Sequence, residues 1–351
     1  MLKILYPCYN NYDLMFGENA EFIIENRQQI IVIDDHSSKV EIEKGKKWCE
    51  ENGVQLNLNP GKGIPAAVDY VVHNYCNKND WILVMQQDVQ FIDRNAISKL
   101  GKRLNCFNLN ENKIGAIGFP NFVSSSHYHP NIENLETVEW KQCWLGLFTL
   151  TNSTFYKPGN FMDRISRLVS TLPVINRKFR KFWHKVIFHR NFAPSTFPKF
   201  LDICKNYEGV CAVELPVWTS VAINVNAWIE SVELDSRFIF HLWFPDVANQ
   251  LMNKSWYVCN DTDFIVHNNW QVKFKYDQMG SVEEGKKNNG KMERYGKHLI
   301  IWKNKWGYDY EDPFPNNRNN PCINRGSILD KMINHNPTKP LKKFDVTGQC
   351  Y

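Results

Sequence analysis

The sequence predicts an α/β fold with a mostly parallel, Rossmann-like sheet flanked by helices. Short apolar runs alternate with amphipathic stretches through the first third of the 351-residue chain, which is the pattern of strands joined by helices. Polar side chains also gather directly after two of these runs, at residues 34–38 and 86–88. Ligands bind at the carboxyl edge of the strands in open α/β sheets, so these two clusters predict a binding site at that edge.

The strands of the first half share a short apolar run that ends in polar or turn residues. We expect them at residues 3–7, 29–33, 54–58, 81–85 and 114–119. The second of them, QIIVI, has hardly a polar residue, which is typical of a strand buried on both faces. Helices are expected at about 40–51 and, after the turn Asn-Pro-Gly-Lys-Gly at 59–63, at 64–74.

The pattern is interrupted from Pro120 to about Pro198 and resumes in the second half of the chain. There the expected elements are an apolar run at 211–224 that leads into a helix near 226–231, a helix at 246–253, and a strand at 261–267 that ends on a histidine. The tail beyond Pro313 is rich in Asn, Pro and Lys, so we expect an extended strap or partial disorder there.

Charge and composition favour one local anionic partner over nucleic acid. The net charge is only +5, and cations gather in a central stretch, RISRLVSTLPVINRKFRKFWHKVIFHRNF at 164–192. A basic, aromatic-rich helix there suits a peripheral contact with a membrane or an anionic acceptor, and a solvated helical face is an equally good interpretation. The aromatic share of 14% also suits surfaces that stack on sugar rings.

The cysteines indicate a reducing compartment. Ten cysteines at irregular spacings, without a C-x-x-C pair, predict reduced and mostly buried thiols rather than a zinc or redox site. The N-terminal MLKILYPC is interpreted as a first core strand and not as a secretory signal. The sequence has no run of about 18 apolar residues, the length that a membrane-spanning helix needs. We therefore expect a cytoplasmic protein with, at most, a peripheral contact to a membrane.

Five segments stand out by their order and spacing along the chain. They are IVIDDHSS at 31–38, NPGKGIPAAVDYVV at 59–72, ILVMQQDV at 82–89, ELDSRFIFHLWFPDVANQLM at 233–252 and IVHNNW at 265–270. Together they resemble the GT-A inverting enzymes of glycosyltransferase family 2, over roughly 3–119 and 214–270. The resemblance implies a GT-A fold, divided into a nucleotide-sugar-binding half at 1–120, a basic aromatic-rich insertion at 121–210, an acceptor-binding half at 211–310 and a C-terminal extension at 311–351.

The resemblance also implies the reaction, a hexosyl-type transfer with inversion from a nucleoside-diphosphate sugar to a hydroxyl of a glycan or lipid-linked acceptor, as in polysaccharide biosynthesis. Such a reaction breaks a bond to a diphosphate, whose charge a divalent metal ion usually holds. It also needs a carboxylate that accepts the acceptor's proton. Mn²⁺ or Mg²⁺ uses one or two carboxylates plus the phosphates, so one Asp at a strand end, helped by a distant His, suffices.

The motifs imply roles for individual residues at the nucleotide sugar. Asp35 would contact the nucleobase or ribose, although an Asp in this position also commonly caps a following helix. Asp69, Gly61 and Gln87 would touch the nucleotide sugar. A solvated helix position explains Asp69 equally well, and plain turn formation explains Gly61 and Gly63 nearly as well.

The resemblance assigns the metal to Asp88 and His267, and the donor diphosphate to Asp88. Gln86 stands where the family's D-x-D motif has its first acid, so the metal would be bound more weakly or would not be needed. A lone histidine at the end of an apolar strand is also commonly a satisfied core residue.

The acceptor side is assigned in the same way. Asp246 would be the general base, with Pro245 in place of the acid that usually neighbours it, and the alternative is that Asp246 caps the helix that follows. Trp218, Trp243 and Trp270 flank these motifs and would stack on acceptor rings, although tryptophan in a core is the ordinary case.

Two related functions are excluded by the turn after the first strand. A dinucleotide-dependent dehydrogenase needs G-x-G-x-x-G there, and a sugar-nucleotide pyrophosphorylase needs a glycine-rich basic loop, whereas this chain has PCYNNYD. Gln86 and Pro245 leave one alternative open, a catalytically weak or inactive GT-A module that binds a glycan or nucleotide sugar.

Overall fold

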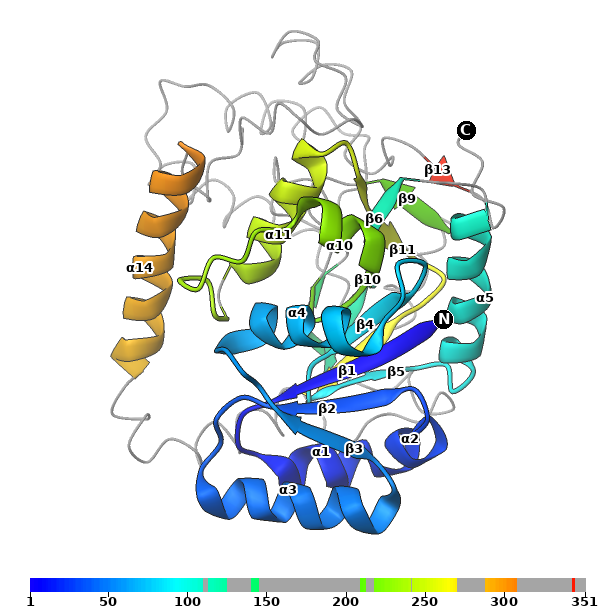
Figure 1. Ribbon diagram of the computed structural model, residues 1–351, viewed down its shortest axis with the longest axis vertical. Coiled ribbons are helices and arrows are strands. Elements are labelled where there is room, and N and C mark those ends of the chain that lie inside the picture. The colour runs from blue at the N-terminus through cyan, green and yellow to red at the C-terminus, as the bar shows by residue number, and fades with distance from the viewer. Residues whose placement is uncertain are drawn as a thin grey trace, which may run out of the picture.

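The computed structural model describes residues 1–109, 113–124, 140–144, 209–212, 218–240, 242–269, 288–307 and 343–344. In this part of the chain a central sheet has the strand order β13-β9-β11-β6-β10-β4-β1-β2-β3 (Figure 1). β9 and β10 run antiparallel to their neighbours, and the other strands share one direction. The strands are β1 (Leu2–Cys8), β2 (Ile30–Asp34), β3 (Gln55–Leu58), β4 (Trp81–Met85), β6 (Ile114–Gly118), β9 (Val210–Ala212), β10 (Ser220–Asn224), β11 (Tyr257–Asp261) and β13 (Lys343–Phe344). The predicted fold class, a Rossmann-like, mostly parallel sheet flanked by helices, is confirmed.

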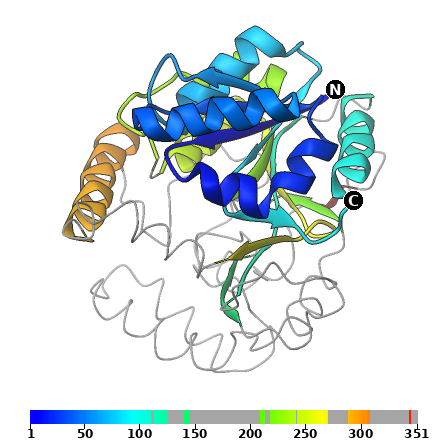
Figure 2. The ribbon, with the colours of Figure 1, turned by 90° about the horizontal axis from the view of Figure 1, so that it is seen from below.

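The central strands contribute side chains to two apolar clusters, one on each face of the sheet. In β2, Ile30 and Val32 belong to one cluster and Ile31 and Ile33 to the other, as predicted for a strand buried on both faces. The first face is covered by α1 (Tyr12–Glu18), α2 (Ala20–Glu25), α3 (Lys39–Asn52) and α5 (Ala96–Leu109). The second face is covered by α4 (Gly63–Tyr75), α10 (Val225–Ser231), α11 (Trp243–Asn253) and α14 (Asn288–Trp306) (Figure 2).

A smaller sheet among the described residues has the strand order β5-β12-β7-β8 and extends away from the central sheet (Figure 2). Its strands are β5 (Val89–Phe91), β7 (Asn121–Ser124), β8 (Trp140–Trp144) and β12 (Val266–Asn269). β5, β7 and β12 continue the chain a few residues after the carboxyl ends of β4, β6 and β11. The smaller sheet therefore starts at the edge where the sequence predicts the binding site.

The predicted strand at 261–267 is wrong, because the chain changes sheets within it. β11 ends at Asp261 and β12 begins at Val266. The buried Asp261 carboxylate accepts the Asp263 N–H at 3.1 Å, and Arg103 Nη1 lies 2.7 and 2.6 Å from its two oxygens, which fixes a turn there. Burial raises the pKa of Asp261 to about 6, and the charge of Arg103 opposes that shift. The apolar alternation of the sequence does not show that a buried ion pair ends the strand.

The other elements predicted within the described residues are confirmed, with ends that shift by at most about three residues. At the apolar run 211–224 the structure describes β9 at its start and β10 at its end. Two expectations fall outside the described residues: the basic segment at 164–192, and the tail beyond Pro313 apart from β13.

Five cysteines have side chains that the structure describes, and no disulfide joins them. Cys8, Cys49 and Cys259 are buried, and Cys76 and Cys106 are partly exposed. In the part of the chain that the structure describes, no helix combines the length and the apolar character that crossing a membrane would require.

Candidate functional site

The loops that leave the carboxyl ends of the central strands are joined by backbone hydrogen bonds. Asp35 N, directly after β2, donates to Cys8 O at the end of β1 at 2.6 Å. Gln86 N, directly after β4, donates to Thr219 O beside β10 at 3.4 Å. The two polar clusters that the sequence singled out therefore lie on one edge of the sheet, as predicted.

Asp35 holds the turn between β3 and α4. Its Oδ1 accepts hydrogen bonds from Asn59 Nδ2 and Gly63 N, both at 2.8 Å, and its Oδ2 lies 3.1 Å from Gly63 N. The alternative that Asp35 caps the following helix is wrong, because Ser38 Oγ caps α3 by accepting Glu41 N at 3.4 Å. Asp35 remains half-buried at the edge of the sheet.

Gly63 is required by close packing at the start of α4. Its φ is +81°, in the left-handed region, and a Cβ there would collide with the backbone of Ile239. Ile64 N donates to Ile239 O at 3.0 Å, and Pro65 has no N–H. With Gly63 N on Asp35, the first donors of α4 are already used, so a phosphate group cannot be held by this helix end in the usual way.

Replacing Gly63 with Ala should therefore cost more stability than the same change at Gly53. Gly53 has a similar φ of +66° but nothing within 4 Å of the position that a Cβ would take, so Gly53→Ala costs only backbone strain, about 1–2 kcal/mol. Gly63→Ala adds the collision with Ile239, a further ~1–3 kcal/mol. Urea denaturation of both variants measures the difference, and equal losses would contradict this account of Gly63.

Gly61 is explained by the turn itself. Its N–H donates to Asn59 Oδ1 at 3.2 Å, and His36 Nε2 lies 2.6 Å from its carbonyl oxygen. A Cβ on Gly61 would lie 2.7 Å from Ala66 Cβ. Gly61 thus faces its own turn, and its assignment to the nucleotide sugar stays a prediction.

Asp69 and Gln87 occupy different surroundings. Asp69 lies two turns into α4, and its Oδ1 accepts Trp228 Nε1 at 3.0 Å and lies 3.4 Å from His73 Nδ1, so it ties α4 to α10. Gln87 lies at the predicted edge, where its Nε2 donates to Asn10 O at 3.0 Å. The structure therefore places Gln87, and not the Asp69 carboxylate, among the loops of the carboxyl edge.

Asp88 and His267 both lie at the β5–β12 pair of the smaller sheet. His267 is directly opposite Gln90 in the antiparallel β5–β12 pair, and Asp88 precedes Gln90 by two residues. Asp88 itself lies in the turn that leads into β5 and is outside the paired register. Both residues are nearly buried, at 6% and 2% exposure. Two segments far apart in the sequence thus bring Asp88 and His267 to the β5–β12 end of the smaller sheet, and their joint role at a metal ion stays a prediction.

The donor set for a metal at this position is small. Within the described residues, no group of three or more His, Cys, Asp or Glu side chains is arranged to hold an ion. Asp88 and His267 fit Mn²⁺ or Mg²⁺ only if phosphate oxygens or waters complete the coordination, with Gln86 as a neutral oxygen donor nearby in sequence.

Two buried polar atoms lie beside these residues and were not singled out from the sequence. Asn121 Nδ2 donates to Thr219 Oγ1 at 3.0 Å, which places the start of β7 against the start of β10. Asn121 Oδ1 and Ser220 Oγ are buried without a hydrogen-bond partner in the described structure. Unpaired buried polar atoms are rare and call for a water or a ligand group. The sequence does carry a signal for these atoms, because Thr219 and Ser220 are two polar residues at the start of a mostly apolar strand.

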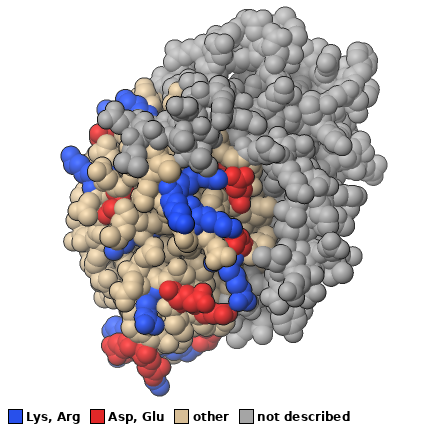
Figure 3. Space-filling view, turned by 90° about the vertical axis from the view of Figure 1, so that its right-hand side faces the viewer, with Lys and Arg blue, Asp and Glu red and all other residues tan. Residues whose placement is uncertain are grey.

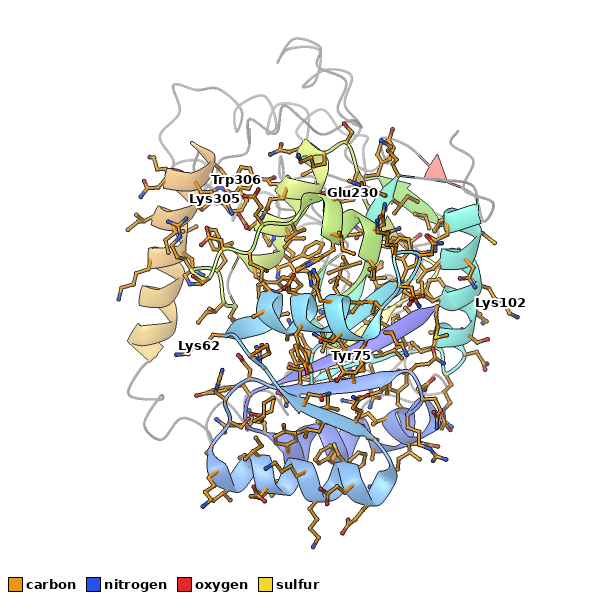
Figure 4. All side chains as sticks on the ribbon, in the orientation of Figure 1. Lys62, Tyr75, Lys102, Glu230, Lys305 and Trp306 are labelled. Carbon is orange, nitrogen blue, oxygen red and sulfur yellow. The ribbon has the colours of Figure 1, made fainter. Side chains whose placement is uncertain are left out.

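Asp246 lies in the first turn of α11, which begins at Trp243, so the alternative that it caps this helix is wrong. It is 3% exposed. Its Oδ2 accepts Lys305 Nζ at 2.8 Å and Gln250 Nε2 at 2.9 Å, and its Oδ1 accepts Trp306 Nε1 at 2.9 Å. Lys305 and Trp306 extend from the end of α14 toward α11 (Figure 4). Neither was predicted from the sequence.

The surroundings of Asp246 act on its pKa in opposite directions. Burial raises the pKa of the Asp246 carboxyl, and the hydrogen bond and charge of Lys305, together with the hydrogen bond of Trp306, oppose that shift. Asp235, whose own pKa is lowered to about 2 chiefly by Arg237, adds to the rise at Asp246. Asp246 is therefore a carboxylate with a raised pKa and a lysine in contact.

The tryptophans predicted to bind the acceptor differ in exposure. Trp243 is 2% exposed and packs edge-on against Phe244, so its place is in the core and not on a binding surface. Trp218 is partly buried against the same cluster, and Trp270 lies outside the described residues. Phe240 is 49% exposed, in the loop between Ile239 and α11, which makes it an accessible aromatic ring that the sequence analysis missed.

The face formed by α5 carries charges of both signs. On the described part of this face, basic and acidic side chains lie next to one another (Figure 3). Lys99 pairs with Asp93 at 2.6 Å, and Arg103 pairs with Asp263 at 2.7 Å as well as with Asp261. On this described face the cations are therefore paired with carboxylates and do not form a uniformly basic patch.

Two solved structures are similar to this chain at low identity. GalNAc-T7, solved with UDP, GalNAc and Mn²⁺, matches at 9% identity and a TM-score of 0.46, over 77% of this chain and 44% of that chain. TarS of S. aureus, residues 1–349, matches at 9% identity and a TM-score of 0.37, over 76% of this chain and 60% of that chain. The chain thus spans less than two thirds of each. A scan against protein-family models found no match, and a search of curated proteins found none.

Proposed function

We propose that the chain is a glycosyltransferase that moves a sugar from a nucleoside-diphosphate sugar to an acceptor hydroxyl with inversion. The observation that carries the proposal is the buried Asp246 carboxylate, whose pKa is raised by burial. A raised pKa suits a general base, because proton transfer is most efficient when the pKa of the base approaches the working pH.

Asp246 is connected to the polar edge of the sheet. The hydrogen bond from Ile64 N to Ile239 O attaches the loop before α11 to the turn that Asp35 holds. The segment at 233–252, which carries Asp246, is therefore packed against the segment at 59–72. A transferase needs this proximity, since the donor sugar and the acceptor hydroxyl must meet at one carbon atom.

In the proposed reaction, Asp246 takes the proton of the acceptor hydroxyl while that oxygen attacks the anomeric carbon. The bond from that carbon to the nucleoside diphosphate breaks on the opposite side, so the configuration inverts. A bound Mn²⁺ or Mg²⁺ would neutralise the charge that develops on the diphosphate. Asp88 and His267 would hold this ion. The ion would be needed because the N–H groups at the start of α4 already donate within the protein and cannot bind the diphosphate.

The remaining assignments follow from position. Asp35, Gly61 and Gln87 lie at the edge proposed for the nucleotide, whereas the contacts of Asp69 with Trp228 support a structural role for Asp69. We propose a glycan or lipid-linked acceptor, with Trp218 and Trp270 near it. The five cysteines with described side chains, which form no disulfide, support a reducing cytoplasm as the site of action.

One observation favours the alternative of a binding module. The Asp246 carboxylate already accepts three hydrogen bonds and is nearly inaccessible, and a catalytically inactive protein would tolerate such an arrangement. Turnover separates the two functions: a transferase releases the nucleoside diphosphate from its sugar, and a binding module does not.

Binding of a nucleoside diphosphate is expected to raise the melting temperature. At a hundredfold excess over Kd, the native state gains about 2.7 kcal/mol, a rise of several degrees for a chain of this size. Uridine, guanosine and thymidine diphosphates would be compared by thermal shift, each with and without Mn²⁺, followed by hydrolysis of the matching sugar nucleotide. Absence of a shift with every nucleotide, in both conditions, would contradict the proposed donor site.

A further inference from the structure

We propose that Lys305 and Trp306, at the end of α14, are positioning residues that hold the Asp246 carboxylate in one orientation and keep it ionised for the transfer step. The inference rests on the proposed function of Asp246 as general base. It assigns a role in the reaction to a helix that lies outside every motif of the resemblance.

The three donors around Asp246 leave a defined position for the acceptor. A carboxylate offers about four lone-pair sites, two on each oxygen. Among the described residues, Oδ2 receives Lys305 Nζ and Gln250 Nε2, and Oδ1 receives Trp306 Nε1. These donors use three of the four sites, and the fourth, on Oδ1, is the one proposed to take the acceptor proton. Because both oxygens accept hydrogen bonds, rotation of the carboxylate would break at least one of them.

The charges that face Asp246 are arranged around Lys305. Lys305 Nζ lies 2.8 Å from Asp246 Oδ2 and 3.5 Å from Asp235 Oδ2, and Arg237 pairs with Asp235 at 2.7 Å. Asp235 and Arg237 come from the loop before α11, and Lys305 comes from α14. Two cations thus face two carboxylates. Arg237 pairs with Asp235, so Lys305 is the cation in contact with Asp246. Its charge offsets the free-energy cost of burying the Asp246 carboxylate.

Lys305 itself is held in place by aromatic rings. Its Nζ lies 5.6 Å from the centroid of the Phe238 ring and 5.4 Å from that of Trp306, distances typical of cation–π contacts. The packing of α14 on the core, in contrast, depends on apolar side chains, among them Trp302, Leu299 and Ile301. Removing the charge of Lys305 should therefore leave the helix in position.

The test is the pH dependence of turnover in Lys305→Met. Without the lysine, the protonated form of Asp246 becomes more favourable, so we expect kcat to fall about tenfold and its acidic limb to move to higher pH, while KM for the donor changes less than twofold. Lys305→Arg keeps the charge and should restore most of the rate and the position of the limb. Trp306→Phe removes one hydrogen bond but no charge, so it should lower kcat with little movement of the limb.

Lys99→Met is the matched control, since Lys99 also pairs with an aspartate, at 2.6 Å, but on α5 across the sheet. It should leave kcat and the pH profile unchanged. If Lys305→Met fails to fold, judged by its thermal melt, Lys305→Gln is measured instead, because it keeps a hydrogen-bond donor without the charge. A wild-type pH profile in Lys305→Met or Lys305→Gln, or a higher kcat in either, would overturn the positioning role and leave Asp246 as the base. Full activity in Asp246→Asn would instead overturn the proposed function.

Discussion

Asp246→Asn is expected to lower turnover by about a hundredfold or more and to leave donor affinity nearly unchanged. The physical reason is that the amide cannot accept the acceptor proton, and general-base catalysis contributes roughly 10²–10⁴-fold to the rate. Donor binding depends on groups on the other side of the reacting carbon, so KM and Kd for the sugar nucleotide should stay close to wild type. Steady-state kinetics and isothermal titration with the donor provide the two measurements.

Asp235→Asn is the matched control for this experiment. Asp235 is a carboxylate of the same cluster, 3.5 Å from Lys305, and it pairs with Arg237 at 2.7 Å. Its replacement removes a negative charge near Asp246 without removing the base, so we expect less than a tenfold loss of turnover. Equal losses in the two variants, or a collapse of donor affinity in Asp246→Asn, would show that Asp246 acts structurally or as a donor ligand.

Asp88→Asn is expected to abolish transfer and to remove the effect of Mn²⁺ on donor binding. The change deletes the only carboxylate of the Gln-Gln-Asp segment and leaves His267 as a single neutral ligand. The measurements are turnover across a Mn²⁺ titration and donor affinity with and without the metal. Asp93→Asn, at an exposed position just beyond β5, is the control and should keep both properties. Unchanged turnover in Asp88→Asn would rule out the metal assignment.

The first half of the fold could be predicted because its strands are buried on both faces. β2 and β4 are apolar at nearly every position, so their limits are visible in the sequence. α14 was missed, since its sequence contains two glycines and scattered charges, and it packs mainly through Trp302 near its end. The break between β11 and β12 was missed because it depends on Arg103, a residue far away in the sequence.

The candidate site, too, could be predicted from the sequence only in part. Polar residues at strand ends indicated Asp35, Gln87 and Asp88, because the carboxyl edge of a parallel sheet follows from the strand pattern alone. The strand pattern did not, however, predict which side chains contact each of these residues. Lys305 reaches Asp246 from a distant helix, and Trp243 turned out to be enclosed by the core. Such contacts are set by how helices pack on the sheet, which the spacing of motifs does not record.

The position of β10 has a consequence for how the polypeptide is made. β10 lies between β4 and β6 in the sheet, yet β4 ends at Met85 and β10 begins at Ser220. A ribosome adds ~5–20 residues per second, so a nascent chain exposes the unpaired edge of β4 for on the order of ten seconds before its partner emerges. An open, apolar strand edge readily pairs with other chains. We therefore expect productive synthesis to depend on chaperones that bind the nascent chain, and a product truncated near residue 120 to aggregate.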